Sequence, residues 1–438
     1  MALLQTDVSR RGFLAGFGVV AAGVITLTAC GTSNSTSTSS GGGEASGDLT
    51  MAVWGGEVDK TAYQARIDML VKKYPELKIT LQLIPSTSYA QKVQTMIAGG
   101  KGPDIMEVAE NVNVYSSKSQ ILPLDKYVSS AKLDLTRLFG PVGKAYSYKD
   151  KVYAIPDRSG AMILYYNKTL FDAKGIKAPT AAWKWDDMLS AAKELTGPGV
   201  WGFGGSGWWP GWWSMVYQNG GAIIDPKTGK PTVDSDAVVE ALQWCGDLMN
   251  KHHVAPTDAQ YADMGPDMGG DQAFAAQKVA MNITGFWNVG TLAADPKIEW
   301  DLAPLWQQKK QAVAAFGSGL AISRDCKNPD AAFKAIEFLT AAKAQAAIIE
   351  SKQDVPANIA VQQSDTFLKP SWMTKPLNMA AFPESSKFVF KSPFIPEWEQ
   401  MQTTFTDGLV DFWLGKQQAG PALKAIQSTL ESLIKPAK

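Results

Sequence analysis

The stretch that decides the fold is "DLTMAVWGGEVDKTAYQARIDMLVKKYPELKITLQLIP", residues 48–85. Its first seven residues are apolar enough for a buried strand. Apolar side chains then recur on one helical face of residues 63–75, and Pro75 ends that helix. In residues 77–85, apolar and polar side chains alternate with the two-residue period of a strand. The stretch therefore predicts a strand, a helix and a second strand.

The same alternation continues downstream. "YAQKVQTMIAGGKG" (residues 89–102) is typical of a helix closed by glycines, and "PDIMEVA" (residues 103–109) is typical of a strand. This order predicts an α/β fold with a mainly parallel sheet and helices on both faces, and such sheets bind ligands at the carboxyl ends of their strands. Trp54, Glu110 and Asn111 follow predicted strands, so we expect them at that edge.

The rest of the chain repeats the pattern less regularly. A length of 438 residues with 45% apolar content is sufficient for two domains with cores of their own. Further strands are expected at residues 151–156, 161–168, 278–284 and 318–323. Helices are expected at residues 183–196 and 235–251, and from about Ala331 onward.

Charge and composition exclude several classes of function. The 42 basic residues balance 42 acidic ones, which offers no general attraction to nucleic acid or to an anionic membrane. Arginines are sparse after the first thirty residues, which argues against a polyanionic ligand. His252 and His253 are the only histidines and are adjacent at the end of an expected helix, so we expect no metal site, histidine-based triad or cofactor.

The N-terminus has the features of an export signal over residues 1–29. "SRRGFL" (residues 9–14) precedes a glycine- and alanine-rich apolar run that is too short to favour a permanent membrane-spanning helix. The paired arginines resemble a twin-arginine signal, although a general secretory signal can also contain them. "LTAC" (residues 27–30) resembles the bacterial lipobox, in which the thiol of Cys30 accepts a diacylglyceryl group.

Residues 30–47 form the expected tether between anchor and domain. "GTSNSTSTSSGGGEASG" cannot bury apolar surface and should be disordered, spanning roughly 20–25 Å. Cys245 and Cys326 then remain as thiols; they could pair outside the cell, although the helical context of Cys245 favours a buried free cysteine. A protein tethered to the outer face of a membrane, without histidine chemistry, is more typical of a capturing protein than of a free enzyme.

A tryptophan-rich segment, "SGWWPGWWS" (residues 206–214), is the most unusual feature of the chain. Its Pro-Gly pair indicates a surface loop, yet each indole buries roughly 200 Å² when packed and has an N–H that needs a partner. Two interpretations remain open. The segment is either a local core, with the loop folded beneath a helix, or a platform for a ligand with apolar faces and a polar rim.

Several motifs together resemble a known family. These are "LTMAVWGGE" (49–57), "AGGKGPDIMEVAE" (98–110), "VYAIPDRSGAMILYYNKTLF" (152–171), "AFAAQKVAMNITGFW" (273–287) and "FGSGLAIS" (316–323) followed by "NPDAAFKAIEFL". Their order over nearly all of residues 48–438 is similar to that of the family 1 extracellular solute-binding proteins of ABC importers, the maltodextrin-binding type.

The resemblance implies a two-lobe fold like that of type II periplasmic binding proteins, whose hinge segments let the lobes close on a sugar without catalysis. Lobe 1 would comprise residues 48–156 and 311–352, and lobe 2 residues 157–310 and the helical residues 353–438. The implied partners are an oligosaccharide and the transmembrane permease subunits of an ABC transporter. The protein would be a monomer, anchored through Cys30 to the extracellular face of the bacterial cytoplasmic membrane.

The resemblance also implies a ligand site. The tryptophan-rich segment matches the part of the second lobe that lines the cleft, and Trp287 matches the tryptophan that stacks on a pyranose. Flat aromatic rings suit the C–H-rich faces of a sugar, while carboxylates and amides suit its hydroxyl rim. The expected ligand-binding residues are Trp54, Glu57, Tyr89, Glu110, Asn111, Asp157, Arg158, Trp208, Trp209, Trp212, Trp287 and Ser318.

Structural roles compete with this assignment at some positions. Asp157 and Arg158 could instead pair with each other, Trp54 could belong to the core, and Trp213 favours a core position. The tryptophans also replace acidic and tyrosine residues of maltodextrin-binding relatives, which argues against maltose itself.

Two other functions remain as alternatives. A lipid-anchored glycoside hydrolase would need two carboxylates on opposite sides of the scissile bond, and Glu57, Glu110 and Asp157 are the candidates. The same fold could also bind a peptide or a compatible solute, because quaternary ammonium ligands favour aromatic cages.

Overall fold

The predicted alternation of strands and helices is present at the start of the domain. A computed structural model describes residues 45–205, 207–295, 297–390 and 392–434, so the export signal and Cys30 lie outside the described residues. The first elements are β1 (Gly47–Trp54), α1 (Glu57–Lys73), β2 (Leu77–Ile84), α2 (Ser86–Ala98) and β3 (Ile105–Val108). They match the expected order of three strands and two helices.

These strands belong to a five-stranded sheet in the order β2-β1-β3-β10-β6. It is completed by β6 (Ala154–Ala161) and β10 (Ala315–Ile322). β1 runs parallel to β2 and β3, whereas β10 is antiparallel to both β3 and β6. Only β10 therefore runs opposite to the other strands of this sheet, which confirms the prediction of a mainly parallel sheet. We call the part of the chain around this sheet lobe 1.

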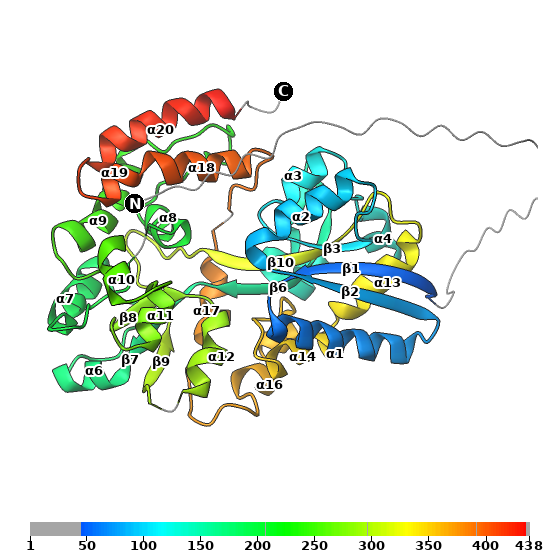
Figure 1. Cartoon of the computed structure of the whole chain (residues 1–438), viewed down its shortest axis with the longest axis horizontal. Helices are drawn as coiled ribbons and strands as arrows, with labels where there is room; N and C mark the ends of the chain where they lie inside the picture. The colour runs from blue at the N-terminus through cyan, green and yellow to red at the C-terminus, as the bar shows by residue number, and fades with distance from the viewer. Residues whose placement is uncertain (1–44, 206, 296, 391, 435–438) are drawn as a thin grey trace, which may run out of the picture. The chain divides into compact units, whose positions relative to one another are not determined.

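Helices cover both faces of the lobe 1 sheet, as Figure 1 shows. Met51 and Val53 pack with α1 and α13 (Pro329–Leu339) in one core, while Ala52 packs with α2 in another. This division follows the alternation of side chains along β1. The remaining elements around this sheet are α3 (Val112–Ser117), α4 (Asp125–Ser130), α5 (Leu135–Phe139), η1 (Gly140–Lys144), β4 (Ser147–Tyr148), β5 (Lys151–Val152), α14 (Ala342–Glu350), α15 (Ile359–Gln362) and α16 (Asp365–Leu368).

A second sheet has three antiparallel strands in the order β8-β7-β9. These are β7 (Ile163–Asn167), β8 (Met281–Thr284) and β9 (Trp300–Ala303), and we call the part around them lobe 2. β9 was not predicted. One residue separates the end of β6 from the start of β7, so the chain passes here directly from one sheet to the other.

Helices account for most of lobe 2, and its largest core joins α8, α9, α18 and α20. The elements are α6 (Lys168–Lys174), α7 (Trp185–Leu195), α8 (Trp209–Gln218), α9 (Asp236–Asn250), α10 (Asp258–Met264), α11 (Gly270–Ala275), α12 (Trp287–Ala294), α17 (Ala381–Ser385), η2 (Ser386–Phe388), α18 (Trp398–Gly408), α19 (Val410–Trp413) and α20 (Ala419–Leu433).

The expected lobe boundaries stay a prediction, although β6 continues across the position between residues 156 and 157. Cys245 and Cys326 are both free thiols, the first partly exposed and the second buried. Among the described helices, none is both long and apolar enough to cross a membrane.

Candidate functional site

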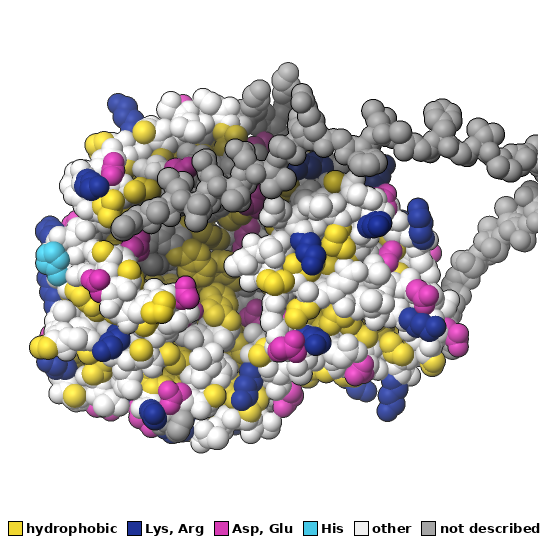
Figure 2. All heavy atoms as spheres, viewed as in Figure 1, with side chains coloured by type: hydrophobic (Ala, Val, Ile, Leu, Met, Phe, Trp, Pro, Cys, Tyr) yellow, Lys and Arg dark blue, Asp and Glu magenta, His cyan; other side chains and the backbone are white. Residues whose placement is uncertain are grey.

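A cleft of about 840 Å³ lies between residues of the two lobes. This volume lies within the usual range for a small-molecule site. Figure 2 shows apolar side chains within the hollow. One wall includes Trp54, Asp59, Ser86, Glu110 and Arg158, and the other includes Trp208, Asp271, Trp287, Gly290 and Thr291. Phe316, Gly317 and residues 351–354 complete the lining.

The lobe 1 wall arises from the topology of its sheet. Trp54 is the last residue of β1, and Ala109 and Glu110 directly follow β3. Because these strands are parallel, their carboxyl ends meet at one edge of the sheet, where a ligand can approach loops and helix N-termini. The structure therefore brings Trp54 and Glu110 to the cleft, as expected from their positions after the strands.

Aromatic rings dominate the opposite wall. Trp208 and Trp287 are 42% and 38% exposed, which is unusual for side chains of their size. Trp208 stacks on Phe316, with their ring centroids 5.1 Å apart. Trp208 and Trp287 meet edge to face, with their ring centroids 6.2 Å apart. The rings support one another and leave part of their apolar surface open to the cleft.

Asp271 holds the indole of Trp287 in place. Trp287 Nε1 donates a hydrogen bond to Asp271 Oδ2 at 3.0 Å, and Thr284 Oγ1 donates to the same oxygen at 3.0 Å. Asn282 Nδ2 donates to Asp271 Oδ1 at 2.7 Å. Three donors from α12 and β8 thus converge on one carboxylate. Because this fixes the indole before a ligand binds, less side-chain entropy is lost when a ligand stacks on it.

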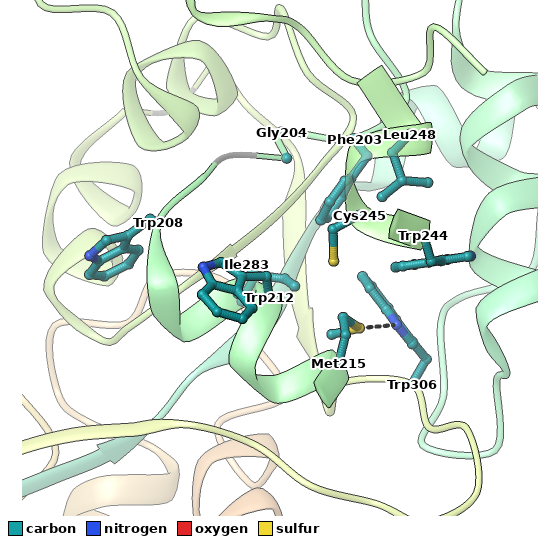
Figure 3. A pocket seen from close by; sticks show the side chains of 12 residues that line it. Phe203, Gly204, Trp208, Trp212, Met215, Trp244, Cys245, Leu248, Ile283 and Trp306 are labelled. Atoms are coloured by element: carbon teal, nitrogen blue, oxygen red, sulfur yellow. Dashed lines mark hydrogen bonds between the residues drawn. The ribbon is translucent and has the colours of Figure 1, made fainter. Parts of the chain in front are cut away.

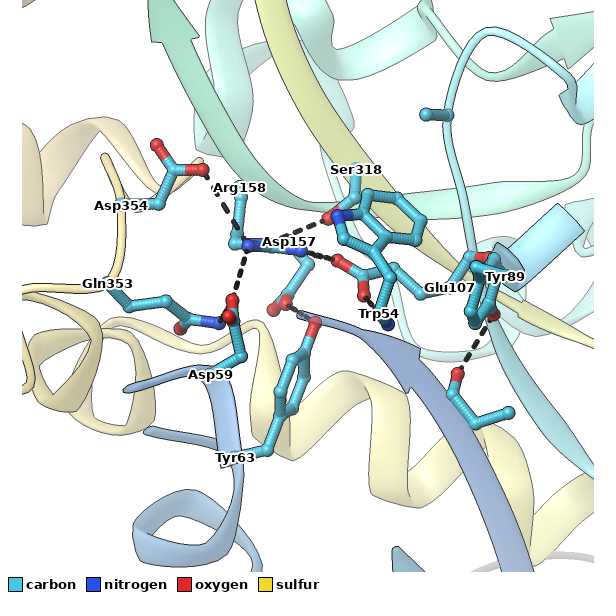
Figure 4. A network of polar contacts seen from close by, with 12 residues as sticks. Trp54, Asp59, Tyr63, Tyr89, Glu107, Asp157, Arg158, Ser318, Gln353 and Asp354 are labelled. Atoms are coloured by element: carbon cyan, nitrogen blue, oxygen red, sulfur yellow. Dashed lines mark hydrogen bonds and ion pairs between the residues drawn. The ribbon is translucent and has the colours of Figure 1, made fainter. Parts of the chain in front are cut away.

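Arg158 is the centre of a polar network at the base of the cleft (Figure 4). Its Nε donates to Glu107 Oε1 at 3.0 Å and Ser318 Oγ at 3.2 Å, and its Nη1 donates to Asp59 Oδ1 at 3.1 Å. Arg158 Nη2 contacts Glu107, and Nη1 lies 3.8 Å from Asp354 Oδ2.

Every guanidinium nitrogen of Arg158 therefore has a protein acceptor, and the group also lies 5.2 Å from the ring centroid of Trp54. Arg158 is better suited to positioning Trp54 and Asp59 than to donating to a ligand.

Asp157 lies beside this network but has other partners. Its side chain is fully buried and forms an ion pair with Arg66, with 2.6 Å between Arg66 Nη1 and Asp157 Oδ1. Tyr63 and Gln345 also donate to the carboxylate. The alternative that Asp157 and Arg158 pair with each other is wrong, because Asp157 pairs with Arg66, whereas Arg158 pairs with Asp59 and Glu107. The expectation that Asp157 lines the cleft is also corrected, since its carboxylate lies within the core.

Four other expected ligand residues lie off the cleft lining. Glu57 has an 81% exposed side chain that pairs with Lys60 on the surface of α1. Tyr89 is buried, and its hydroxyl contacts the backbone oxygens of Ala52 and Glu107. Ser318 is buried and accepts from Arg158, and Asn111 Oδ1 accepts from the backbone N–H of Ala109 at 3.2 Å. These side chains support the cleft from behind or lie outside it.

The tryptophan-rich segment divides between cleft and core. The loop predicted from Pro210 and Gly211 is wrong, because both residues lie in the first turn of α8, where proline is well tolerated. Trp208 precedes the helix and faces the cleft, Trp209 is partly buried, and Trp212 is 2% exposed. The expectation that Trp212 lines the ligand cleft is therefore corrected. Trp213 is fully buried, as expected of a core residue.

Trp212 instead lines a separate apolar cavity of about 40 Å³ behind Trp208. Figure 3 shows it beside Met215, Trp306 and Cys245, with Trp306 Nε1 donating to Met215 Sδ at 3.3 Å. Burial strongly raises the pKa of the Cys245 thiol, which disfavours its reactive thiolate.

Several cleft residues were not predicted from the sequence. These are Asp59, Ser86, Asp271, Phe316, Gln353 and Asp354. Phe316 lies inside one of the motifs that carried the resemblance, so its position offered a signal. Asp271 and Asp354 offered none, because they come from segments without a distinctive pattern. Within the described residues, no group of three or more histidine, cysteine or acidic side chains is arranged to hold a metal ion.

Comparison with known proteins identifies the family. Residues 54–346 match the family model described as bacterial extracellular solute-binding protein. A maltooligosaccharide ABC transporter solute-binding lipoprotein of Streptococcus pneumoniae is 24% identical over 78% of this chain and 79% of its own length. An ABC substrate-binding protein of Listeria monocytogenes, solved in complex with cycloalternan, is 26% identical with a TM-score of 0.79, over 88% of this chain and 98% of that chain.

The GacH receptor of Streptomyces glaucescens, solved unliganded and in complex with acarbose, has a TM-score of 0.76 at 24% identity, over 90% of this chain and 100% of that chain. These relatives are named as binding proteins and receptors, and the two solved structures confirm the two-lobe α/β fold. The chain belongs to the bacterial extracellular solute-binding protein family.

Proposed function

We propose that this protein captures an oligosaccharide in the cleft between its lobes and delivers it to the permease of an ABC transporter. The observation that carries the proposal is the pair of exposed indoles, Trp208 stacked on Phe316 and Trp287 edge to face with it, in a cleft of about 840 Å³. Sugar rings have apolar C–H faces, so they are suited to flat aromatic surfaces of this kind. The sugar-binding names of the relatives support the same ligand class.

The polar lining suits the hydroxyl rim of a sugar. Glu110 and Ser86 lie at the cleft and can exchange hydrogen bonds with ligand hydroxyls. In our proposal Trp287 stacks on a pyranose ring, Trp208 contacts a neighbouring ring, and Trp54 lies on the opposite wall. Arg158, Tyr89 and Ser318 act indirectly, by positioning the lobe 1 wall.

The carboxylates that a glycoside hydrolase would need are distributed differently. Of the three candidates, Glu110 lines the cleft, while Glu57 is on the surface and Asp157 is in the core. These three groups do not flank a common site, so the carboxylate pair expected from the sequence is not assembled, and the binding-protein names of the relatives favour binding.

The export features complete the proposal. We infer that the signal over residues 1–29 is removed, that Cys30 is acylated, and that the domain remains tethered to the extracellular face of the cytoplasmic membrane as a monomer. The lipoprotein relative from Streptococcus pneumoniae supports this location. Proximity to the membrane would raise the local concentration of the loaded protein at the permease.

The decisive experiment is a calorimetric screen of the purified chain against manno-, xylo-, gluco-, galacto- and fucosyl-oligosaccharides, with choline and a peptide mixture as non-sugar ligands. We expect at least one saccharide to bind, and Trp287→Ala to weaken that binding at least fivefold, because a stacking surface worth about 1–3 kcal/mol is lost. Trp183→Ala is the matched control, since Trp183 packs on Phe171 in lobe 2 outside the cleft lining.

Binding of choline or peptide in place of every saccharide would contradict the proposal. Release of reducing ends during incubation with an oligosaccharide would indicate a hydrolase instead.

A further inference from the structure

The cleft has an excess of negative charge. Its lining includes four carboxylates, Asp59, Glu110, Asp271 and Asp354, but two cationic side chains, Arg158 and Lys352. Lys352 Nζ lies 5.4 Å from the ring centroid of Trp372, which is not part of the lining. Arg158 is shared among Asp59, Asp354 and the buried Glu107. These cations therefore cannot neutralise the lining.

Two of the carboxylates have no cationic partner among the described residues. Asp271 is held by three neutral donors, and no ion pair joins Glu110 to a lysine or arginine of the described chain. A partly buried carboxylate without a counter-charge is costly, and a cation from the ligand would relieve that cost. Burial raises the pKa of Glu110 to about 7, which reflects the same lack of compensation.

Gln353 also lines the cleft, but the polar atoms of its side chain are buried or bonded to the protein. Gln353 is 4% exposed, and its Nε2 donates to Asp59 Oδ1 at 3.0 Å. Its Oε1 has no hydrogen-bond donor among the described residues, although Gln353 lines the cleft. Meanwhile the donors of Arg158 and Trp287 are already committed to protein carboxylates. The cleft thus offers the carboxylate oxygens of Glu110 as acceptors, while its guanidinium donors are already occupied.

The aromatic wall is compatible with a positively charged ligand. The faces of Trp208 and Trp287 attract cations through the ring quadrupole, in addition to packing on apolar C–H surface. An anionic sugar would instead meet four carboxylates, an arginine whose nitrogens are already occupied, and a single lysine, Lys352. Charge and aromatic surface agree on the same class of ligand.

We propose that the cleft selects a saccharide bearing an amino group, with its ammonium beside Glu110; this rests on the sugar-binding function proposed above. This charge preference would distinguish amino sugars from neutral sugars and uronic acids, which are otherwise similar in shape. Glu110 is the specificity-determining residue, because it is the cleft carboxylate without a described side-chain partner.

The test uses sugars matched in ring and stereochemistry. The probes are glucosamine, glucose and glucuronic acid, the corresponding galactose triplet, and β-1,4-linked dimers of glucosamine and glucose, titrated against the purified chain by calorimetry at pH 7.5. In each set that binds, we expect the amine to bind about tenfold tighter than the neutral sugar. The uronic acid should bind more weakly than both.

Glu110→Gln should reduce the preference for the amine over the neutral sugar to less than about threefold, because the amide keeps the shape and removes the charge. Glu76→Gln, which alters an exposed residue outside the cleft lining, should retain the full preference. Equal or tighter binding of the neutral sugar in every binding set would overturn the inference while leaving sugar capture intact. An equal effect of the two variants would overturn it as well, and absence of binding to any saccharide would overturn both proposals.

Discussion

Alanine substitutions at Trp208 and Trp212 should have opposite consequences, although the two residues are four positions apart. Trp212 is 2% exposed and packs against Trp213 and Phe405, with ring centroids 5.9 Å and 5.4 Å away. Its truncation leaves a core cavity, which should cost about 3–5 kcal/mol of the free energy of unfolding. The unfolding entropy of a domain of about 390 residues is roughly 0.8 kcal/mol per kelvin, so Tm should fall by about 4–6 °C.

Trp208 is 42% exposed, and its described ring contacts are with Phe316 and Trp287. Losing them should cost about 1–2 kcal/mol of stability, because an aromatic pair contributes about 0.5–1.5 kcal/mol beyond its buried area. If the ring stacks on a sugar, Trp208→Ala should also raise Kd about five- to a hundredfold. Trp212→Ala should leave Kd of the folded fraction within about twofold, a change of less than about 0.5 kcal/mol.

The assay measures both quantities on the same preparations. Differential scanning calorimetry gives Tm, and titration with the tightest saccharide of the screen gives Kd at a temperature at which both variants remain folded. Trp183→Ala, which removes a partly buried indole outside the cleft lining, controls for the general effect of losing a tryptophan. A Trp208→Ala variant with unchanged Kd, or a Trp212→Ala variant that loses affinity at constant Tm, would refute the assignment of these residues to cleft and core.

Four further predictions concern other parts of the molecule. Asp157→Ala should lower the free energy of unfolding by about 3–5 kcal/mol in denaturant titrations, because Arg66 is left buried without its counter-charge. Stability should fall as pH rises from about 5 to 7. Burial raises the folded-state pKa of Glu110 to about 7 and that of Asp354 to about 6, so the folded protein retains protons that the unfolded chain releases. Glu110→Gln should flatten this dependence of stability on pH in melting curves. Saturating saccharide should raise Tm and decrease the radius of gyration in X-ray scattering, whereas an unchanged radius would indicate a static platform. Cys30→Ser should release the protein into the medium or leave it unprocessed, as fractionation and immunoblotting can show, because no thiol remains to be acylated.

The fold could be predicted where periodicity was strong. In residues 48–85, apolar side chains recur with a period of two residues in one part and of about 3.6 residues in another. Both periods correspond to faces that pack inward in the structure. β9 has four residues, "WDLA", and unlike the equally short β3 and β8 it was not predicted. The first strand was predicted from its continuous apolar run, and Met51 and Ala52 belong to different cores because neighbouring side chains of a strand point to opposite faces.

The candidate site could be predicted only where topology determines position. Trp54 and Glu110 follow strands of a parallel sheet, so their place at the cleft follows from the order of the elements. Asp271 and Asp354 reach the cleft from α11 and from the segment after α14, and neither place follows from local sequence. Their positions depend on how the two lobes pack, which is a property of distant residues. The binding roles of all these residues stay predictions.

The errors at Asp157 and at the tryptophan-rich segment have a common physical origin. Local sequence determines which side chains share a face, but not which face meets the ligand. The pairing of β6 with β10 is irregular at Asp157, so Asp157 and Arg158 both reach α1, where Asp157 pairs with the buried Arg66 and Arg158 pairs with Asp59. Likewise, Pro210 fits the first turn of a helix as well as it fits a loop. Once α8 begins at Trp209, the helical period turns Trp212 and Trp213 towards Phe405 and Trp398 of α18, while Trp208 remains before the helix at the cleft. The choice between platform and core was therefore not a single choice for the segment, because the helix boundary divides it.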